Sequence, residues 1–222
     1  MTHFPFATVG FDLDGTLLDT SGDLAAAVNH ALTSLGREPL PVERIRPMIG
    51  GGARHMLEQA MTATGAGGDL DAALDELLAY YEAHMTVHTR PFPQVVETLD
   101  ALRALGVTLA CVTNKREHFT LKLLTALGLR DRFACVIGGD TLGEDRAKPK
   151  PDMLLAMLDR CAGPAAFVGD SIYDVQAARA AGLPVVACAF GYRQGPVEEL
   201  GADAVIDSFA ELIPTLRRLR PA

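Results

Sequence analysis

The segment Val9-Gly-Phe-Asp-Leu-Asp-Gly-Thr-Leu17 joins a short apolar run to two carboxylates, Asp12 and Asp14, that lie two positions apart. Side chains two apart in a strand point to the same side, so a strand ending here brings both acids to one edge of a sheet. Two carboxylates that close need a cation, a shared proton or open water, and a hard divalent cation with oxygen ligands is the simplest solution. The alternative is an ordinary Asp-Gly turn, and the rest of the chain decides between the two.

Six short apolar runs, the first of them in this segment, lack the alternation of half-buried strands and are typical of strands buried on both faces. They are Thr8–Phe11, Thr108–Val112, Cys135–Ile137, Ala165–Val168, Pro184–Ala189 and Ala204–Ile206. Helical patterns alternate with them at 94–105, 115–127, 152–162 and 173–181. This alternation predicts an α/β fold with a doubly wound, Rossmann-like parallel sheet.

A long interval between the first two predicted strands interrupts this alternation of strands and helices. Apolar residues recur there at helical spacing in 23–35, 53–63 and 70–85. We therefore predict a small helical cap domain, residues 19–91, inserted into a catalytic core formed by residues 1–18 and 92–222.

Composition limits the possible functions. The 222 residues carry a net charge of −8 and no basic patch with interleaved aromatic residues, which argues against nucleic-acid binding. No apolar run approaches the ~18 residues of a membrane span. The first six residues lack a basic start and an apolar signal core, so we expect a cytoplasmic protein. Cys111, Cys135, Cys161 and Cys188 are widely spaced, and we expect reduced core residues.

Polar side chains follow other predicted strands as well. They are Thr113, Asn114 and Lys115, then Gly169, Asp170, Ser171 and Asp174, with Lys148 and Lys150 in the loop before the fourth strand. Taken singly, these residues could be helix caps or an exposed extended loop. Ligands bind at the carboxyl ends of parallel strands, so together they predict one site. Acids that hold magnesium, beside hydroxyl, amide and ammonium groups that hold a phosphate, favour phosphoryl transfer.

Four of these segments resemble the motifs of the haloacid dehalogenase superfamily, in order and at normal separations. They are Asp12-Leu-Asp-Gly-Thr16, Thr113-Asn114, Lys148-Pro149 and Gly169-Asp-Ser-x-x-Asp174. The resemblance covers essentially the whole chain. Intact motif residues disfavour a non-catalytic binding module on the same fold, which is the alternative from a different class.

Within the superfamily, the chain is most similar to the bacterial phosphoglycolate phosphatases. The similar stretches are Phe11–Thr20, Asp23–Val28, Gly50–Arg54, Val112–Lys115 and Val168–Ser171. Gly51 is a departure, because those phosphatases often carry an Asn between the two glycines. The resemblance implies a magnesium-dependent phosphatase that converts 2-phosphoglycolate to glycolate and phosphate through an aspartyl-phosphate. The alternatives are a phosphatase for another small sugar phosphate or a sugar-phosphate mutase of the same superfamily.

The resemblance also implies roles for the acids. Asp12 would attack the phosphorus. Magnesium would be held by the Asp12 carboxylate, the Asp14 main-chain carbonyl and the Asp170 carboxylate. The Asp14 side chain would then be free to act as general acid and later as general base.

The remaining motif residues would bind the phosphate or hold other residues of the site in place. Thr113, Asn114 and Lys148 would bind the phosphate, and Lys148 would also neutralise charge on the nucleophile. Lys148 aligns with the family's Lys-Pro, which favours it over Lys150. Asp174, with Ser171 beside it, would support Lys148 or a metal-bound water.

The predicted cap holds the candidates for substrate specificity, Gly51 and Arg54, although the Gly50–Gly52 turn could equally be a plain helix start. The absence of lysine between Asp23 and His88 argues against a phosphonate hydrolase, which needs a cap lysine to form an imine. We expect the partner to be a small phosphorylated metabolite, with no nucleic acid and no membrane, and the protein to be a monomer or homodimer.

Overall fold

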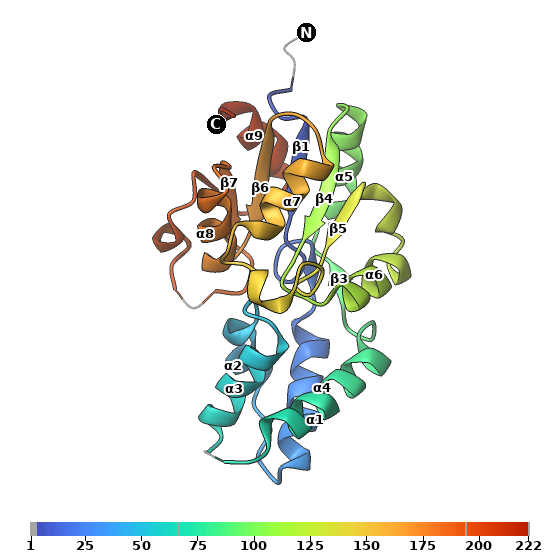
Figure 1. The fold of residues 1–222 in the computed structure, drawn as a ribbon, viewed down its shortest axis with the longest axis vertical. Helices are drawn as coiled ribbons and strands as arrows, with labels where there is room; N and C mark the ends of the chain where they lie inside the picture. Colours follow the sequence, from blue (N-terminus) through green and yellow to red (C-terminus); the bar gives the residue numbers. More distant parts are fainter. Residues whose placement is uncertain (1–3, 66, 194, 222) are drawn as a thin grey trace.

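A computed structural model describes residues 4–65, 67–193 and 195–221. The predicted N-terminal segment and domain ranges include residues 1–3, 66, 194 and 222, which lie outside this description. The described chain forms a layered sheet domain with a group of helices at one end of the sheet (Figure 1).

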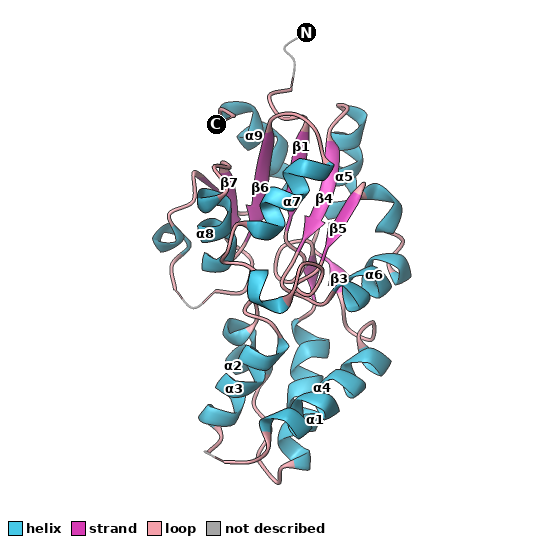
Figure 2. Ribbon diagram, viewed as in Figure 1, coloured by secondary structure: helices cyan, strands magenta, loops and turns pink. Residues whose placement is uncertain are grey.

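The central sheet is parallel and has the strand order β5-β4-β1-β6-β7-β8. Its strands are β1 (Thr8–Phe11), β4 (Thr108–Val112), β5 (Cys135–Ile137), β6 (Ala165–Gly169), β7 (Val185–Cys188) and β8 (Ala204–Ile206). The predicted doubly wound fold is confirmed, and the six apolar runs are its six strands (Figure 2).

Helices cover both faces of this sheet. One face packs on α5 (Val95–Ala104), α6 (Glu117–Ala126) and α9 (Leu212–Arg218), and the other on α7 (Asp152–Arg160) and α8 (Ile172–Ala180). Alternate strand residues divide between the two cores: Cys111 belongs to the first and Val112 to the second. In β1, a Cβ at Gly10 would lie 2.5 Å from the Met157 sulfur, so the missing side chain lets α7 sit close to the sheet.

The first four α-helices of the described chain, all between β1 and β3 (Arg90–Pro91), form a separate group: α1 (Ser21–Ser34), α2 (Val42–Ile45), α3 (Ala53–Ala63) and α4 (Leu70–His84). We call them the α1–α4 group. They lie at the end of the sheet where the loops after the strands emerge (Figure 1). The short helix α2 is absent from the sequence prediction, because four residues are too few to show a helical period.

Two chain crossings connect this group to the sheet domain. The short strands β2 (Leu18–Asp19) and β3 (Arg90–Pro91) pair antiparallel across them. On α1, the buried Asp23 carboxylate accepts hydrogen bonds from His88 N (2.9 Å), Thr89 N (2.9 Å) and Thr89 Oγ1 (2.8 Å). The start of α1 is therefore tied to the returning chain.

Tyr192, from the loop after β7, reinforces the first crossing. Its hydroxyl accepts from Thr20 N at 2.7 Å and Ser21 N at 3.0 Å, and it donates to the Asp19 carboxylate. Burial opposes ionisation of Asp19, but hydrogen bonds from Ser21 and Tyr192 outweigh it and hold the pKa of Asp19 below its ordinary value.

Two expectations from composition bear on the fold. Cys111, Cys135, Cys161 and Cys188 are free and buried, as predicted. Within the described ranges, no helix combines the length and the hydropathy that crossing a bilayer would require.

Candidate active site

The site lies where the strand order reverses. β1 pairs with β4 on one side and with β6 on the other, although both strands come much later in the chain. Such a switch point leaves a crevice at the carboxyl ends of the strands. Asp12 follows β1, Thr113 follows β4 and Asp170 follows β6, so the topology brings these three predicted residues together.

Lys148 holds the candidate nucleophile in place. Its ammonium donates to Asp12 Oδ1 at 2.8 Å, Asp174 Oδ1 at 2.6 Å and the Val112 carbonyl at 2.9 Å. All three ammonium hydrogens are thereby used, and the side chain is 2% exposed. Burial disfavours the ammonium, but Asp12 and Asp174 outweigh it and raise the pKa of Lys148. Lys150, the alternative lysine, instead bonds the Asp145 carbonyl at the surface.

Asp170 is enclosed by main chain. Thr16 Oγ1 donates to its Oδ1 at 3.3 Å, and Tyr192 N donates to its Oδ2. Gly15 has φ +83°, and a Cβ there would lie 2.2 Å from Asp170 Oδ2. A Cβ at Gly191 would lie 2.2 Å from the Asp170 Cβ. Both positions need glycine so that the chain can wrap this carboxylate.

Asp174 organises the start of α8. Its Oδ2 accepts from Asp170 N at 3.1 Å, Ser171 N at 3.0 Å and Ser171 Oγ at 2.7 Å, while its Oδ1 accepts from Lys148. Both oxygens are committed to protein donors. Asp174 therefore positions Lys148 and the loop that carries Asp170.

The acids fit a divalent cation. Carboxylate oxygens of Asp12, Asp170 and Asp174 lie within 4.8 Å of one another. Burial raises the pKa of Asp12 to about 6 against the pull of Lys148, and burial with Asp174 and Asp12 raises the pKa of Asp170. A hard cation would relieve this repulsion. Because Asp174 is committed, the available oxygens are those of Asp12, Asp170 and the Asp14 carbonyl, which accepts no hydrogen bond from the described residues.

Asp14 has two partners to which the sequence analysis gave no role. Lys115 Nζ donates to Asp14 Oδ2 at 2.8 Å, and Thr20 Oγ1 donates to Asp14 Oδ1 at 2.7 Å. The position of Lys115 directly after Thr113 and Asn114 placed it at this edge of the sheet, but nothing in the sequence indicated its contact with Asp14. Its side chain is 6% exposed, so the ion pair lies inside the site.

The Asn114 side chain links two other segments of the chain by hydrogen bonds to their main chain. Its amide donates to Gly50 O at 3.0 Å and to Lys148 O at 2.9 Å, and its oxygen accepts from Lys148 N at 2.9 Å. A phosphate contact from Asn114 therefore has to come from its main-chain N–H. The Thr113 hydroxyl accepts from Lys115 N at 3.3 Å, which leaves its own hydrogen available.

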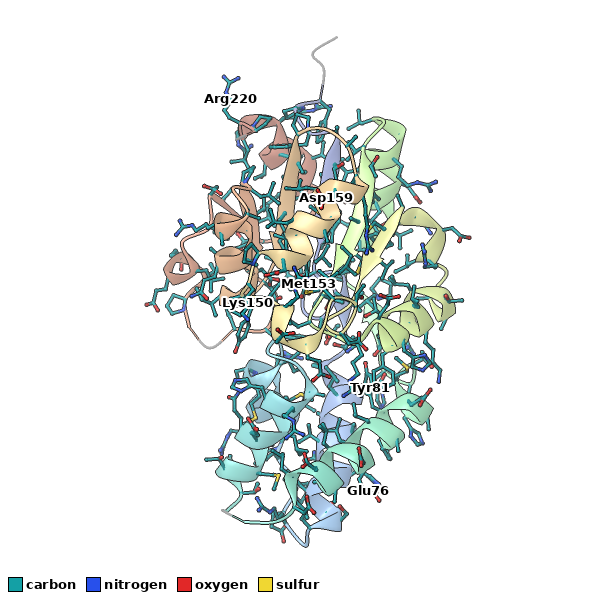
Figure 3. The ribbon with its side chains drawn as sticks, viewed as in Figure 1. Glu76, Tyr81, Lys150, Met153, Asp159 and Arg220 are labelled. Atoms are coloured by element: carbon teal, nitrogen blue, oxygen red, sulfur yellow. The ribbon has the colours of Figure 1, made fainter. Side chains whose placement is uncertain are left out.

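A cavity of about 560 Å³ separates this edge of the sheet from the α1–α4 group. Asp12, Asp14, Thr113, Lys115 and Lys148 line it from one side, and Gly50–Met56, Leu77 and Tyr81 line it from the other. Figure 3 shows Tyr81 at the end of α4 near the sheet domain, whereas Glu76 lies further out.

The two predicted specificity residues both line this cavity. A Cβ at Gly51 would lie 2.6 Å from the His55 ring, so an Asn there would require that ring to move. The Arg54 guanidinium pairs with Asp71 of α4, and its side chain is 52% exposed.

Comparison with known proteins places this geometry in context. The family model for haloacid dehalogenase-like hydrolases matches residues 9–188. A phosphoglycolate phosphatase of Agrobacterium fabrum is 39% identical over 97% of this chain and 95% of its own. One of Nitrosospira multiformis is 43% identical over 97% and 99%. The crystal structure of a predicted phosphoglycolate phosphatase from Haemophilus somnus superposes with a TM-score of 0.88 at 32% identity, covering 95% and 97% of the two chains.

Proposed function

Because the chain belongs to the haloacid dehalogenase-like hydrolases, we propose that it is a phosphatase that hydrolyses 2-phosphoglycolate to glycolate and phosphate. The substrate is carried over from relatives of that name at 39% and 43% identity over nearly the whole chain. The reaction type is supported by one observation. Lys148 holds the buried Asp12 by one oxygen, and the second oxygen makes no hydrogen bond with any residue in the described ranges.

In the first half of the proposed reaction, the Asp12 carboxylate forms a bond to the phosphorus and the ester P–O bond breaks. Asp14, which has to be in its protonated form for this step, gives its proton to the leaving oxygen of glycolate. Lys148 neutralises charge on Asp12 and the transferring group, and the Thr113 hydroxyl and the Asn114 N–H hold phosphate oxygens.

In the second half, water attacks the phosphorus of the aspartyl-phosphate and Asp14 takes its proton. The bond from phosphorus to Asp12 breaks, which restores the carboxylate and releases phosphate. Asp174 and Ser171 keep Lys148 and the Asp170 loop in place through both halves.

We propose magnesium as the cation, held by Asp12, Asp170 and the Asp14 carbonyl. When bound, it lowers the repulsion between the anionic nucleophile and the anionic substrate.

Residues 19–91 are proposed to act as a cap over the core formed by 1–18 and 92–222. The hydrogen bond from Asn114 to the Gly50 carbonyl supports this, because it links the site directly to the segment before α3. Closure would exclude bulk water, and Gly51 and Arg54, which line the cavity from the cap side, would help to set substrate specificity. The proposal includes a cytoplasmic location, a small-molecule partner and a monomeric or homodimeric state.

A second candidate is a phosphatase for a larger sugar phosphate, favoured by a cavity of about 560 Å³. Steady-state phosphate release from a panel of small monoesters, with magnesium and with chelator, separates the two. We expect the highest kcat/KM for 2-phosphoglycolate and no turnover in chelator. A higher kcat/KM for a hexose phosphate would refute the proposed substrate, and full activity in chelator would refute the metal.

A further inference from the structure

The Lys115 ammonium lines the cavity and has more hydrogens than its ion pair with Asp14 uses. Its ammonium lies 2.8 Å from Asp14 Oδ2 and 4.8 Å from the centre of the Tyr81 ring. An ammonium has three hydrogens; among the described residues Asp14 accepts one, and the Tyr81 hydroxyl is close enough to interact with a second. At least one hydrogen remains for a ligand in the cavity that Lys115 lines.

Tyr81 supplies a second polar group beside this ammonium. Its ring is held edge-on against Phe119, with centroids 5.6 Å apart and planes at 88°. The hydroxyl is buried and makes no hydrogen bond of ordinary geometry with the described chain, although the Lys115 ammonium lies close enough to interact with it. Burial raises the pKa of Tyr81 to about 12 against the charge and hydrogen bonding of Lys115, so the group stays a neutral donor at physiological pH. A hydroxyl beside an ammonium keeps its own hydrogen for an acceptor, and a buried hydroxyl whose hydrogen finds no acceptor is unfavourable, so an anionic ligand would complete it.

We propose that Lys115 and Tyr81 form the subsite for the carboxylate of the substrate, an inference that rests on the proposed function. In 2-phosphoglycolate a single carbon joins the carboxylate to the ester oxygen. Asp14 has to reach that ester oxygen to protonate it, and Lys115 is in contact with Asp14. The ammonium is therefore beside the place where the carboxylate must lie.

Arg54 is less suited to this role. Its side chain is about half exposed and already paired with Asp71, so solvent screens its charge. The side chain of Lys115 is 6% exposed, and an ion pair there is screened much less.

The walls around this subsite favour a short acid over a sugar. Leucine side chains line the α1–α4 side of the cavity beside Tyr81, namely Leu24, Leu74, Leu77 and Leu78. Sugar hydroxyls facing them would lose water without gaining partners, which is costly. One carboxylate held by Lys115 and Tyr81 leaves no further polar group to satisfy.

The test compares 2-phosphoglycolate with 2-hydroxyethyl phosphate, in which a neutral alcohol replaces the carboxylate. Steady-state kinetics give kcat and KM for both substrates in the magnesium-loaded protein and in Lys115→Met, Lys115→Arg and Tyr81→Phe. Lys122→Met is the matched control, because that lysine lies 45% exposed on α6 and bonds the Glu82 carbonyl. Any effect of Lys115 on Asp14 acts on both substrates and cancels in the ratio of their kcat/KM values.

We expect Lys115→Met to lower the preference for 2-phosphoglycolate by about tenfold to a hundredfold, mainly through KM, as for a lost charged hydrogen bond. Lys115→Arg should restore part of it, Tyr81→Phe should lower it less, and Lys122→Met should preserve it. A preference that survives in both Lys115→Met and Tyr81→Phe would overturn the subsite while leaving the proposed function intact. If the unmodified protein itself shows no preference, the proposed substrate fails and the subsite fails with it.

Discussion

Replacing Asp12 by asparagine should make the metal-free protein more stable while destroying its activity. The pKa of Asp12 rises from 3.8 to about 6 on folding, mainly because the carboxyl is buried. The folded chain therefore holds this proton more tightly than the unfolded chain does. Stability is then lost as the pH rises from about 4 to about 6, and the full cost remains above that range.

The size of the effect follows from the shift. About two pKa units correspond to about 3 kcal/mol of unfolding free energy at neutral pH. The amide introduced by Asp12→Asn keeps the shape of the carboxyl without the charge, so the variant should escape this cost. For a chain of this length, about 3 kcal/mol corresponds to a rise in Tm of roughly 6–12 °C.

Thermal unfolding of the parent and of Asp12→Asn, in chelator at pH 7.5 and at pH 4, measures this gain in stability. The gain should be present at pH 7.5 and largely absent at pH 4, where the native carboxyl is protonated. Saturating magnesium should reduce the difference in Tm between Asp12→Asn and the parent protein. Magnesium binds the carboxylate of the parent better than the amide of the variant, so it stabilises the parent more. Asp159→Asn, on the exposed face of α7 (Figure 3), is the matched control and should change neither Tm. An Asp12→Asn protein no more stable than the parent at pH 7.5 in chelator would refute the reasoning.

Three further perturbations test other parts of the site. Asp14→Asn should lower kcat strongly while calorimetry still detects magnesium binding, because the proposed metal contact is its main-chain carbonyl; loss of metal affinity as the main defect would reverse that assignment. Tyr192→Phe should cost about 1–3 kcal/mol in urea unfolding, because it leaves the buried N–H groups of Thr20 and Ser21 without their acceptor, and an unchanged midpoint would remove Tyr192 from the crossing. Chelator should abolish phosphate release, and added magnesium should restore it. Calcium should bind but support turnover poorly because of its looser coordination. Equal rates of phosphate release with magnesium and calcium would contradict this.

Most of the strands could be predicted from the sequence because they are buried on both faces; the edge strand β8, where Val205 is exposed, is the exception. Thr8–Phe11, Thr108–Val112 and Cys135–Ile137 coincide with β1, β4 and β5, since strands covered by helices on both sides read as continuous apolar runs. The predicted Pro184–Ala189 run is longer than β7, Val185–Cys188, by one residue at each end, because apolar residues continue past the paired segment.

Two kinds of site residue could be predicted from the sequence: those that follow a strand directly, and those such as Lys148 and Asp174 that belong to a recognisable motif. Asp12 and Asp170 could be placed at one edge because each follows a strand of a predicted parallel sheet, and the structure shows that these two strands are neighbours. Tyr81 and Tyr192 could not, since their positions depend on how α4 and the loop after β7 fold back onto that edge. The Asn114 side chain was predicted as a phosphate ligand, and its three hydrogen bonds to Gly50 and Lys148 arise only in the folded chain.

In the proposed reaction Asp12 carries the phosphoryl group of 2-phosphoglycolate. Rapid acid quench of the magnesium-loaded protein with substrate labelled in its phosphate, followed by peptide mapping, detects such an intermediate. We expect transient label on the peptide containing Asp12, lost as phosphate is released, and no label in the Asp12→Asn protein. Phosphate release with the label on a different residue, or undiminished release by the Asp12→Asn protein, would contradict it.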